Sequence, residues 1–430
     1  MSPSVLSPRF FVAVVVILLV CRLVSWAVGR IGQPPVVGEM IAGVLLGPSL
    51  LGAVASGAEN ELFPTAVRPL LYVAGQIGLV AFMFQVGHEF RTHLGRGLAR
   101  SAAAVSAAGT VVPLALGALL AFGAHGRVDV FVPSVAPGVT YAFVGVTLAI
   151  TAFPMLARII SERGLTGTRY GSLALASGAI DDVVAWCLLA GVLAAATGRP
   201  RPILLAVGGA AAFALAVLYL VRPLLTRVLG PHGPQDEVRM LIVAAVLFAA
   251  AWFTDEIGLY AVFGAFCVGM AMPANAAAEH AVVTISTPNR IVFLPLFFVY
   301  SGLNTRFGLL TNRPLLVFSA VAVLLAVLGK FTACWAAARL AGQERPVALR
   351  LGTLMNARGL MQLIALNVGL AAGIVNSALF TALVLVALIT TLMAAPMLSW
   401  LDRRVPMPDP EPEQEPGQEP TPFGAVAATG

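Results

Sequence analysis

The chain has 430 residues, of which 59% are hydrophobic and 11% are charged, and its mean hydropathy is +0.92. Because soluble domains carry about 25% charged residues, this composition excludes a soluble globular protein and indicates a chain that crosses a membrane several times. The net charge of +6 does not indicate a nucleic-acid partner, since the arginines lie at the ends of apolar segments, where they set membrane orientation.

Apolar segments of about 20 residues, long enough to span a bilayer as helices, recur along the whole chain. We therefore predict an all-α polytopic membrane protein with about thirteen transmembrane helices. The candidate spans lie near residues 10–28, 34–52, 69–88, 100–123, 138–160, 169–197, 202–225, 238–254, 257–273, 287–303, 314–340, 347–371 and 376–401.

Basic residues predict the orientation of these spans. An odd number of spans places the termini on opposite sides of the membrane. If the C-terminus is cytoplasmic, 16 arginines fall on the inner side and 7 on the outer side. This asymmetry predicts a multi-pass protein of the cell membrane with its N-terminus outside and its C-terminus in the cytoplasm.

The chain divides into a transmembrane domain over residues 1–405 and a tail over residues 406–430. The tail is rich in proline and glutamate, so it cannot bury a core and is predicted to be a disordered, acidic cytoplasmic segment. The four cysteines fall inside apolar segments without metal-ligand spacing. We expect buried thiols, no disulfide framework and no cofactor.

The sixth span contains two adjacent carboxylates, Asp181 and Asp182, in the middle of an apolar run. A charge at that depth costs a few kcal/mol, and two like charges side by side resist ionising together. Neighbours on a helix point about 100° apart, so the two acids face different partners. The pattern favours ion binding or proton relay over a charge kept only for helix packing.

Lys330 lies inside the eleventh span and is the only lysine beside 25 arginines. A buried ammonium can lose its proton, whereas a guanidinium effectively cannot. We therefore expect Lys330 to pair with one of the carboxylates. The alternative is a lysine that extends along its helix to reach the membrane surface.

Two spans are interrupted by residues that break a helix or carry polar groups. Pro154 lies within the fifth span, and Asn356, Arg358 and Gly359 lie within the twelfth. In secondary transporters, paired broken helices in two inverted repeats surround the substrate site. We expect Arg358 to lie against the partial negative charges at helix C-terminal ends. We also expect Ser177, at the start of the stretch that contains Asp181 and Asp182, to support the ion site together with Pro154, Asn356 and Arg358.

Several motifs together resemble the second monovalent cation/proton antiporter family. The segment from Gln33 to Pro48 resembles its second-span signature, the segment from Thr151 to Arg158 its broken helix, and the stretch around Asp181-Asp182 its ion-binding helix. Further matches, in the style of the plant and bacterial cation/proton exchanger branch, are 294–303, Gly329-Lys330 and 356–360. The resemblance covers residues from about 10 to 403.

The resemblance implies an inverted-repeat NhaA-like fold with two crossed discontinuous helices. It also implies a core bundle, a second bundle that makes a homodimer, and elevator-type alternating access. Carried over, Asp182 is the site that binds either a monovalent cation or a proton, Asp181 pairs with Lys330, and Thr151 lies near the ion. An aspartate together with the lysine resembles the electrogenic members.

The sequence therefore predicts a secondary monovalent cation/proton antiporter of the lipid bilayer, which exchanges Na⁺ or K⁺ for H⁺ in pH homeostasis. The alternative is a cation channel or channel-like K⁺ efflux protein, although the chain has no repeated filter-like loops or acidic rings. An enzyme is not expected, because no nucleophile–base set or metal-ligand cluster is present.

Overall fold

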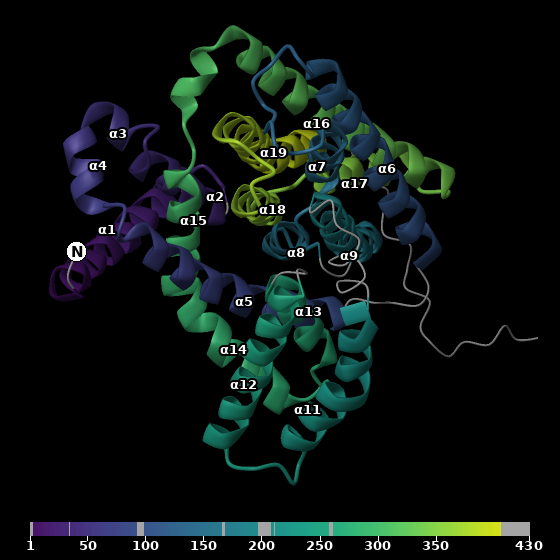
Figure 1. The fold of residues 1–430 in the computed structure, drawn as a ribbon. Helices are drawn as coiled ribbons and strands as arrows, with labels where there is room; N and C mark the ends of the chain where they lie inside the picture. The colour runs from purple at the N-terminus through teal and green to yellow at the C-terminus, as the bar shows by residue number, and fades with distance from the viewer. Residues whose placement is uncertain are drawn as a thin grey trace, which may run out of the picture.

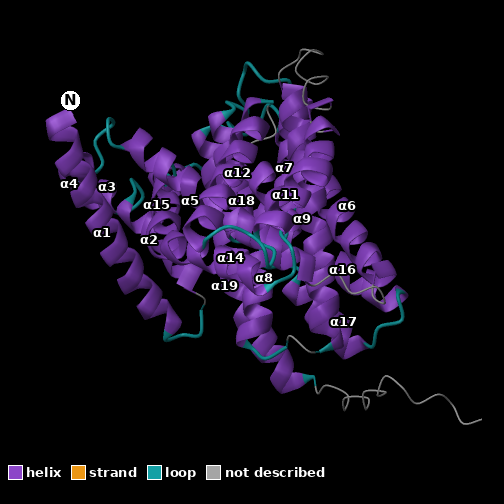
Figure 2. Cartoon of the chain, turned by 90° about the horizontal axis from the view of Figure 1, so that it is seen from below, coloured by secondary structure: helices purple, strands orange, loops and turns teal. Residues whose placement is uncertain are grey.

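The computed structural model describes residues 3–33, 35–92, 99–165, 168–196, 208–209, 211–257 and 261–405. Within these ranges the chain consists of helices and loops, without a strand (Figure 2). The all-helical prediction is confirmed for this part of the chain. The predicted tail, residues 406–430, and part of the predicted seventh span, 202–225, lie outside the described residues.

Within the described ranges, ten helices are long and apolar enough to cross a membrane. A helix satisfies its own backbone polar groups, which a bilayer cannot do. Three shorter apolar helices, Pro137–Ala149, Ala261–Ala271 and Met361–Ala371, fall in the predicted fifth, ninth and twelfth spans. The multi-pass architecture is therefore confirmed, while the number thirteen stays a prediction.

One group of helices occupies the left and lower parts of Figure 1, where α5 packs on α13 and α15, and α2 packs on α1 and α15. We call it the first group. It comprises α1 (Pro3–Gly29), α2 (Pro35–Leu46), α3 (Leu51–Val54), α4 (Ser56–Leu62), α5 (Arg68–Thr92), the π-helix η1 (Val217–Val221), α11 (Arg222–Val228), α12 (Asp236–Glu256), α13 (Ala261–Ala271), α14 (Ala276–Pro288), the π-helix η2 (Asn289–Phe293) and α15 (Leu294–Leu303).

The second group lies at the centre and upper right of Figure 1, where α6 packs on α7, α9 and α16, and α16 packs on α17 and α19. It comprises α6 (Ala99–Ala124), α7 (Pro137–Ala149), α8 (Phe153–Glu162), α9 (Arg169–Ala196), α16 (Arg313–Leu340), α17 (Arg345–Leu354), α18 (Leu360–Ala371) and α19 (Ser377–Arg404). The short 3₁₀ helix η3 (Phe307–Thr311) leads into α16.

The predicted tenth span, 287–303, begins later than the observed helical segment, which starts at Ala276. The side chain of Asn275 accepts a hydrogen bond from the backbone N–H of Ala278 and so caps the helix. Glu279 and His280 lower the hydropathy of the following turn, which is why the apolar pattern alone missed it.

Two glycines let α2 and α15 approach each other closely. A Cβ atom built on Gly302 would lie 2.0 Å from the carbonyl atoms of Gly43, and one on Gly43 would lie 2.3 Å from the carbonyl oxygen of Phe298. Small residues allow such contact between membrane helices. This contact holds the first group together along α2 and α15.

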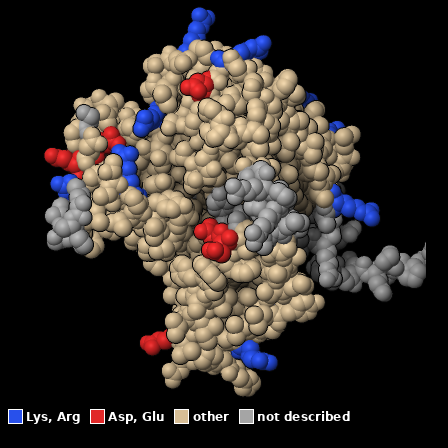
Figure 3. All heavy atoms as spheres, in the orientation of Figure 1, with Lys and Arg blue, Asp and Glu red and all other residues tan. Residues whose placement is uncertain are grey.

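Charged side chains on the face shown in Figure 3 are few and lie mostly near its margin. By contrast, Asp181, Asp182, Lys330 and Arg358 are at most 1% exposed. Burying unpaired charges is costly, so the second group must contain the groups that compensate them.

Candidate functional site

Asp181 and Asp182 lie near the middle of α9, which packs on α6, α7, α8 and α17. Their surroundings differ, as expected for neighbours on one helix. Asp181 is directed at α6 and α16, whereas Asp182 lines a small cavity beside α18.

Asp181 accepts hydrogen bonds from four side chains. Oδ2 accepts from Lys330 Nζ at 2.7 Å and from the Thr151 hydroxyl at 2.7 Å. Oδ1 accepts from the hydroxyls of Ser106 at 2.5 Å and Thr110 at 3.3 Å. A carboxylate has two oxygens that can accept several hydrogen bonds, and these four donors occupy both of them.

Lys330 is fully buried on α16 and has a second partner besides Asp181. Its Nζ donates to the carbonyl oxygen of Ala149 at 2.6 Å. Ala149 is the last residue of α7, where the helix dipole leaves partial negative charge. The ammonium is therefore held between a carboxylate and a helix C-terminus.

Asp182 is 1% exposed, and neither of its carboxylate oxygens has a hydrogen-bond partner within ordinary limits among the described residues. The backbone N–H of Phe153, at the start of α8, approaches this carboxylate. A buried carboxylate without a partner is unfavourable. The charged form of Asp182 therefore lacks the side-chain donors that Asp181 has.

The two helix breaks meet beside these acids. Residues 150–152 separate α7 from α8, and residues 355–359 separate α17 from α18. The backbone N–H of Ala152 donates to the carbonyl oxygen of Ala357 at 2.9 Å. The Thr151 hydroxyl also lies 3.4 Å from the carbonyl oxygen of Met355. The two predicted discontinuous helices therefore cross at their breaks.

Arg358 and Asn356 donate hydrogen bonds from the second break to carbonyl oxygens of α7 and α16. Arg358 donates to the carbonyl oxygens of Thr147 at 3.4 Å and Ala326 at 3.0 Å, and it has no carboxylate partner among the described residues. Asn356 donates to the carbonyl oxygen of Val327 at 2.9 Å. Arg358 thus places positive charge near the C-terminal end of α7, where the helix dipole favours it.

Two supporting residues from the sequence lie apart from the acids' hydrogen bonds. The Ser177 hydroxyl donates to the carbonyl oxygen of Leu173 at 2.8 Å within α9. Pro154 lies in the first turn of α8, after the break at 150–152, and its side chain lies outside the described part of the structure. The roles of the predicted site residues stay predictions.

Sequence reasoning missed Ser106 and Thr110, the two hydroxyl partners of Asp181 on α6. They lie four residues apart and therefore on one face of the helix. Isolated hydroxyls are common in membrane helices, so the spacing alone was a weak signal. Only the packing of α6 on α9 shows which face they occupy.

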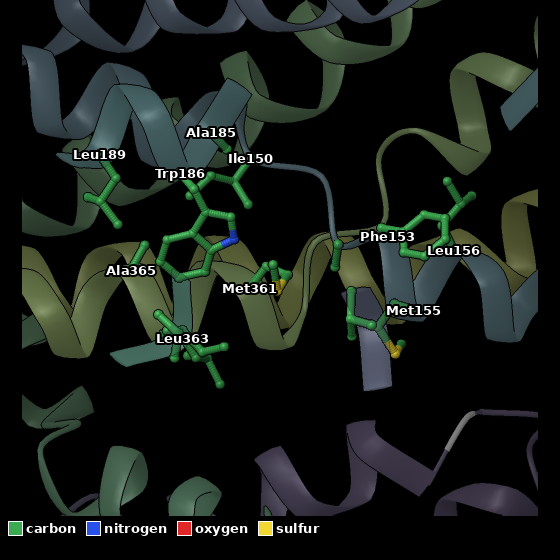
Figure 4. Close-up of a cluster of buried hydrophobic side chains, with 14 of the residues drawn as sticks. Ile150, Phe153, Met155, Leu156, Ala185, Trp186, Leu189, Met361, Leu363 and Ala365 are labelled. Atoms are coloured by element: carbon green, nitrogen blue, oxygen red, sulfur yellow. The ribbon is translucent and has the colours of Figure 1, made fainter. Parts of the chain in front are cut away.

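A larger cavity of about 1170 Å³ opens between the two groups and reaches the first break at Ala152 and Met155. Its polar lining includes Arg22, Ser25, Glu39, Gln85, Glu89, Asn289 and Arg290. Asp182 lines a separate and much smaller cavity, whose other walls are Ile150, Ala185, Trp186, Leu189, Met361 and Ala365 (Figure 4).

A family model described as the transmembrane part of sodium/hydrogen exchangers matches residues 15–403. The chain belongs to the sodium/hydrogen exchanger family. The expected membership of a monovalent cation/proton antiporter family is confirmed, and with it the expectation of a transporter in place of an enzyme.

Relatives within the exchanger family include the Na⁺/H⁺ antiporter NhaS4 of Synechocystis sp., which is 35% identical over 395 residues, or 89% of this chain and 95% of the relative. Cation/H⁺ antiporter 17 of Arabidopsis thaliana is 32% identical, covering 91% of this chain and 48% of the relative. K⁺/H⁺ antiporter 1 of Saccharomyces cerevisiae is 32% identical, covering 89% and 45%. The chain thus spans about half the length of these plant and yeast exchangers.

The sodium proton antiporter MjNhaP1 of Methanocaldococcus jannaschii at pH 8 has a similar fold, with a TM-score of 0.66 over 92% of this chain and 97% of that one. The sequences are only 12% identical. The likeness confirms the predicted antiporter fold and carries no further conclusion.

Proposed function

We propose that this exchanger moves a monovalent cation, Na⁺ or K⁺, across the cell membrane against protons. The observation that carries the proposal is Asp182, a buried carboxylate without a hydrogen-bond partner in the described chain, beside two crossed helix breaks. Related chains are named Na⁺/H⁺, K⁺/H⁺ and cation/H⁺ antiporters, which supports exchange as the activity.

The exchange follows from competition at one carboxylate. Burial favours the protonated form of a carboxyl group, and a nearby cation favours the ionised form. A proton and a metal ion therefore compete for the oxygens of Asp182. An unoccupied, charged Asp182 crosses the low-dielectric barrier only at high cost. The binding site therefore moves across the membrane only when a proton or a cation is bound to Asp182. Proton and cation are exchanged as a result.

Lys330 makes the cycle electrogenic. Its ammonium is fully buried and holds Asp181 at 2.7 Å, and a buried lysine can release its proton. A cation that enters beside Asp181 and Asp182 weakens this pair and favours proton release from Lys330. More than one proton then moves for each cation, so net charge crosses the membrane.

Alternating access occurs by an elevator-type movement of the second group against the first. The cavity of about 1170 Å³ lies between them and reaches Ala152, while Asp182 lines a separate small cavity with mostly apolar walls. With the N-terminus outside, this cavity opens to the cytoplasm. The first group forms the homodimer, and its helix α1 exposes the apolar side chains that such contact needs, among them Phe11, Leu19 and Leu23.

The test is exchange by the full chain in proteoliposomes with an imposed pH gradient. Addition of Na⁺, K⁺, Li⁺ or Rb⁺ is compared in parallel, with and without a clamped membrane potential. We expect saturable, cation-dependent dissipation of the gradient that responds to the clamp and disappears in Asp182→Asn. The matched control is Asp129→Asn, since Asp129 is an exposed residue outside the site.

Two results would contradict the proposal. Undiminished exchange in Asp182→Asn would remove this carboxylate from the ion site. Ion currents far above carrier rates would favour the channel alternative, because a carrier changes conformation for every ion that it moves.

A further inference from the structure

The small cavity beside Asp182 has one polar wall besides the carboxylate, the indole of Trp186. The volume open to the centre of a water molecule is about 10 Å³, close to the least that one buried water needs. The remaining walls are the apolar side chains Ile150, Ala185, Leu189, Met361 and Ala365. Any polar ligand there must find its side-chain partners in Trp186 and Asp182.

Trp186 presents an unpaired hydrogen-bond donor to this cavity. It lies four residues after Asp182 on α9, so both side chains share one face of the helix. The residue is 6% exposed, and its Nε1–H has no acceptor among the described residues. Figure 4 shows the indole nitrogen on the ring edge that faces the break between Ile150 and Phe153, away from Leu189. A buried indole N–H ordinarily has a partner.

Asp182 supplies the complementary acceptor. Neither of its oxygens has a hydrogen-bond partner within ordinary limits in the described ranges, although the backbone N–H of Phe153 approaches the carboxylate. The two buried basic side chains of this region already have other hydrogen-bond partners. Lys330 bonds Asp181, and Arg358 bonds two carbonyl oxygens. A single cavity thus contains one orphan donor, one orphan acceptor and space for one small molecule that can serve both.

We propose that this cavity is a binding site for one water molecule, which accepts a hydrogen bond from Trp186 Nε1–H and donates one to Asp182. Trp186 is thereby a positioning residue for the carboxylate. When a cation reaches Asp182, the water oxygen is available as a further ligand, because monovalent ions favour oxygen donors. This role in transport rests on the proposed exchange at Asp182, whereas the water site itself does not.

The first experiment measures the hydrogen bond without transport. Ultraviolet resonance Raman spectra of the purified full chain and of Trp186→Phe are subtracted, which isolates the indole band of Trp186 that responds to N–H hydrogen bonding. We expect the signature of a hydrogen-bonded indole that exchanges its proton in D₂O. A free, non-bonded N–H would overturn the water site, whatever the protein transports.

The second experiment measures cation exchange by Trp186→Phe in proteoliposomes. Loss of one hydrogen bond of ordinary strength should raise the KM for the cation about three- to tenfold, with the maximal rate and the thermal midpoint little changed. Trp335→Phe is the matched control, because Trp335 on α16 also has an unpaired indole nitrogen in the described structure but does not line this cavity. An unchanged KM in Trp186→Phe would overturn the positioning role.

A second variant tests the same water while keeping the tryptophan. Ala365→Val adds volume to the cavity wall and should displace the water, raising the KM by a similar factor. The double variant Trp186→Phe/Ala365→Val should then have the same KM as the single variants, since each substitution removes the same water molecule. Additive effects would overturn the shared water. Absence of exchange in the wild-type chain would refute the proposed function, and the Raman measurement would still decide the water site.

Discussion

At the scale of single residues, the two adjacent aspartates differ in the number of groups that stabilise their charge. Asp181 accepts hydrogen bonds from Lys330 and three hydroxyl groups, whereas Asp182 accepts none from a side chain in the described structure and is approached by the backbone N–H of Phe153. The charge of the first is compensated by side-chain donors, and that of the second is not. The assignment of Asp182 as the exchange site remains a prediction that this asymmetry supports.

The asymmetry predicts opposite effects of two identical substitutions on stability. Asp181→Asn leaves the Lys330 ammonium buried without its counter-charge and should lower the free energy of unfolding by about 3–5 kcal/mol. Asp182→Asn removes a buried carboxylate that accepts no side-chain hydrogen bond in the described structure and should leave stability unchanged or raise it. Thermal unfolding of the purified variants in detergent checks both, and equal loss in the two would contradict the asymmetry.

A second prediction concerns the pair of Asp181 and Lys330. Lys330→Met should destabilise the protein, because Asp181 then keeps only hydroxyl partners. Adding Asp181→Asn to that background should recover part of the loss, since no unpaired charge remains. A double-mutant cycle on thermal stability measures the coupling between the two side chains. Strictly additive losses would show that the 2.7 Å contact does not couple them.

Transport by Lys330→Met should also change the charge moved per cycle. The proposed electrogenic cycle needs proton release from this lysine. Comparing exchange rates at several clamped potentials measures the effect. An unchanged dependence on potential would remove Lys330 from the proton pathway.

At the scale of elements, the crossing of the two broken helices depends on close backbone contact. Gly359, the residue directly before α18, has φ +59° and ψ −127°, a conformation that residues with a Cβ rarely adopt. A Cβ at this position would also lie 3.0 Å from Met155 Cγ on α8. The glycine therefore serves both the turn of the break and its contact with the other broken helix.

Gly359→Ala should destabilise the protein more than Gly373→Ala. Both positions have positive φ, +59° and +69°, so alanine is strained at each. Only Gly359 has a neighbour within contact distance, since nothing lies within 4 Å of a Cβ at Gly373. We expect about 1–3 kcal/mol from backbone strain at either site, with an additional loss at Gly359. Thermal unfolding compares them, and equal losses would show that Met155 moves aside freely.

At the scale of the whole molecule, hydrogen bonds connect the two helix groups at a few points. Asn367 on α18 donates to the Ser301 hydroxyl on α15 at 2.5 Å, and Gln33 donates to the carbonyl oxygen of Leu392 at 3.0 Å. An elevator movement has to break contacts of this kind in every cycle. If the two helix groups did not move against each other, these hydrogen bonds would stay intact throughout the cycle.

Ser301→Ala should therefore raise the turnover rate of exchange while lowering the thermal midpoint slightly. One hydrogen bond contributes about 0.5–1.5 kcal/mol, so a rise of a few-fold is expected where the movement limits turnover. Ser319→Ala is the matched control, because the Ser319 hydroxyl bonds Leu315 within α16 alone. Unchanged turnover in Ser301→Ala would argue against movement between α15 and α18.

The tail after α19 is predicted to be dispensable for exchange. Arg350 donates to the carbonyl oxygen of Val405 at 2.8 Å and bonds Asp402 at 3.0 Å, so a truncation has to keep these residues. A chain that ends at Pro406 should retain full activity in proteoliposomes. Loss of exchange in that variant would show that the predicted disordered segment has a functional role.

The sequence by itself determined where most helices lie, because a bilayer imposes long apolar segments whose pattern is local. It also singled out Asp181, Asp182, Lys330 and the two interrupted spans, since charges and helix breakers inside such segments are costly enough to stand out. The start of the helix at Ala276 was not predicted, because capping by Asn275 extends the helix through polar residues.

Only the tertiary structure decided which groups meet. Ser106 and Thr110 on α6 bond Asp181 on α9, and the C-terminal end of α7 bonds Lys330 on α16. Nothing in the local pattern of α6 distinguishes its two hydroxyls from ordinary polar residues of a membrane helix. The same holds for the cavity that Trp186 and Asp182 share with α18. Such contacts join residues far apart in the chain, and only helix packing brings them within hydrogen-bonding distance.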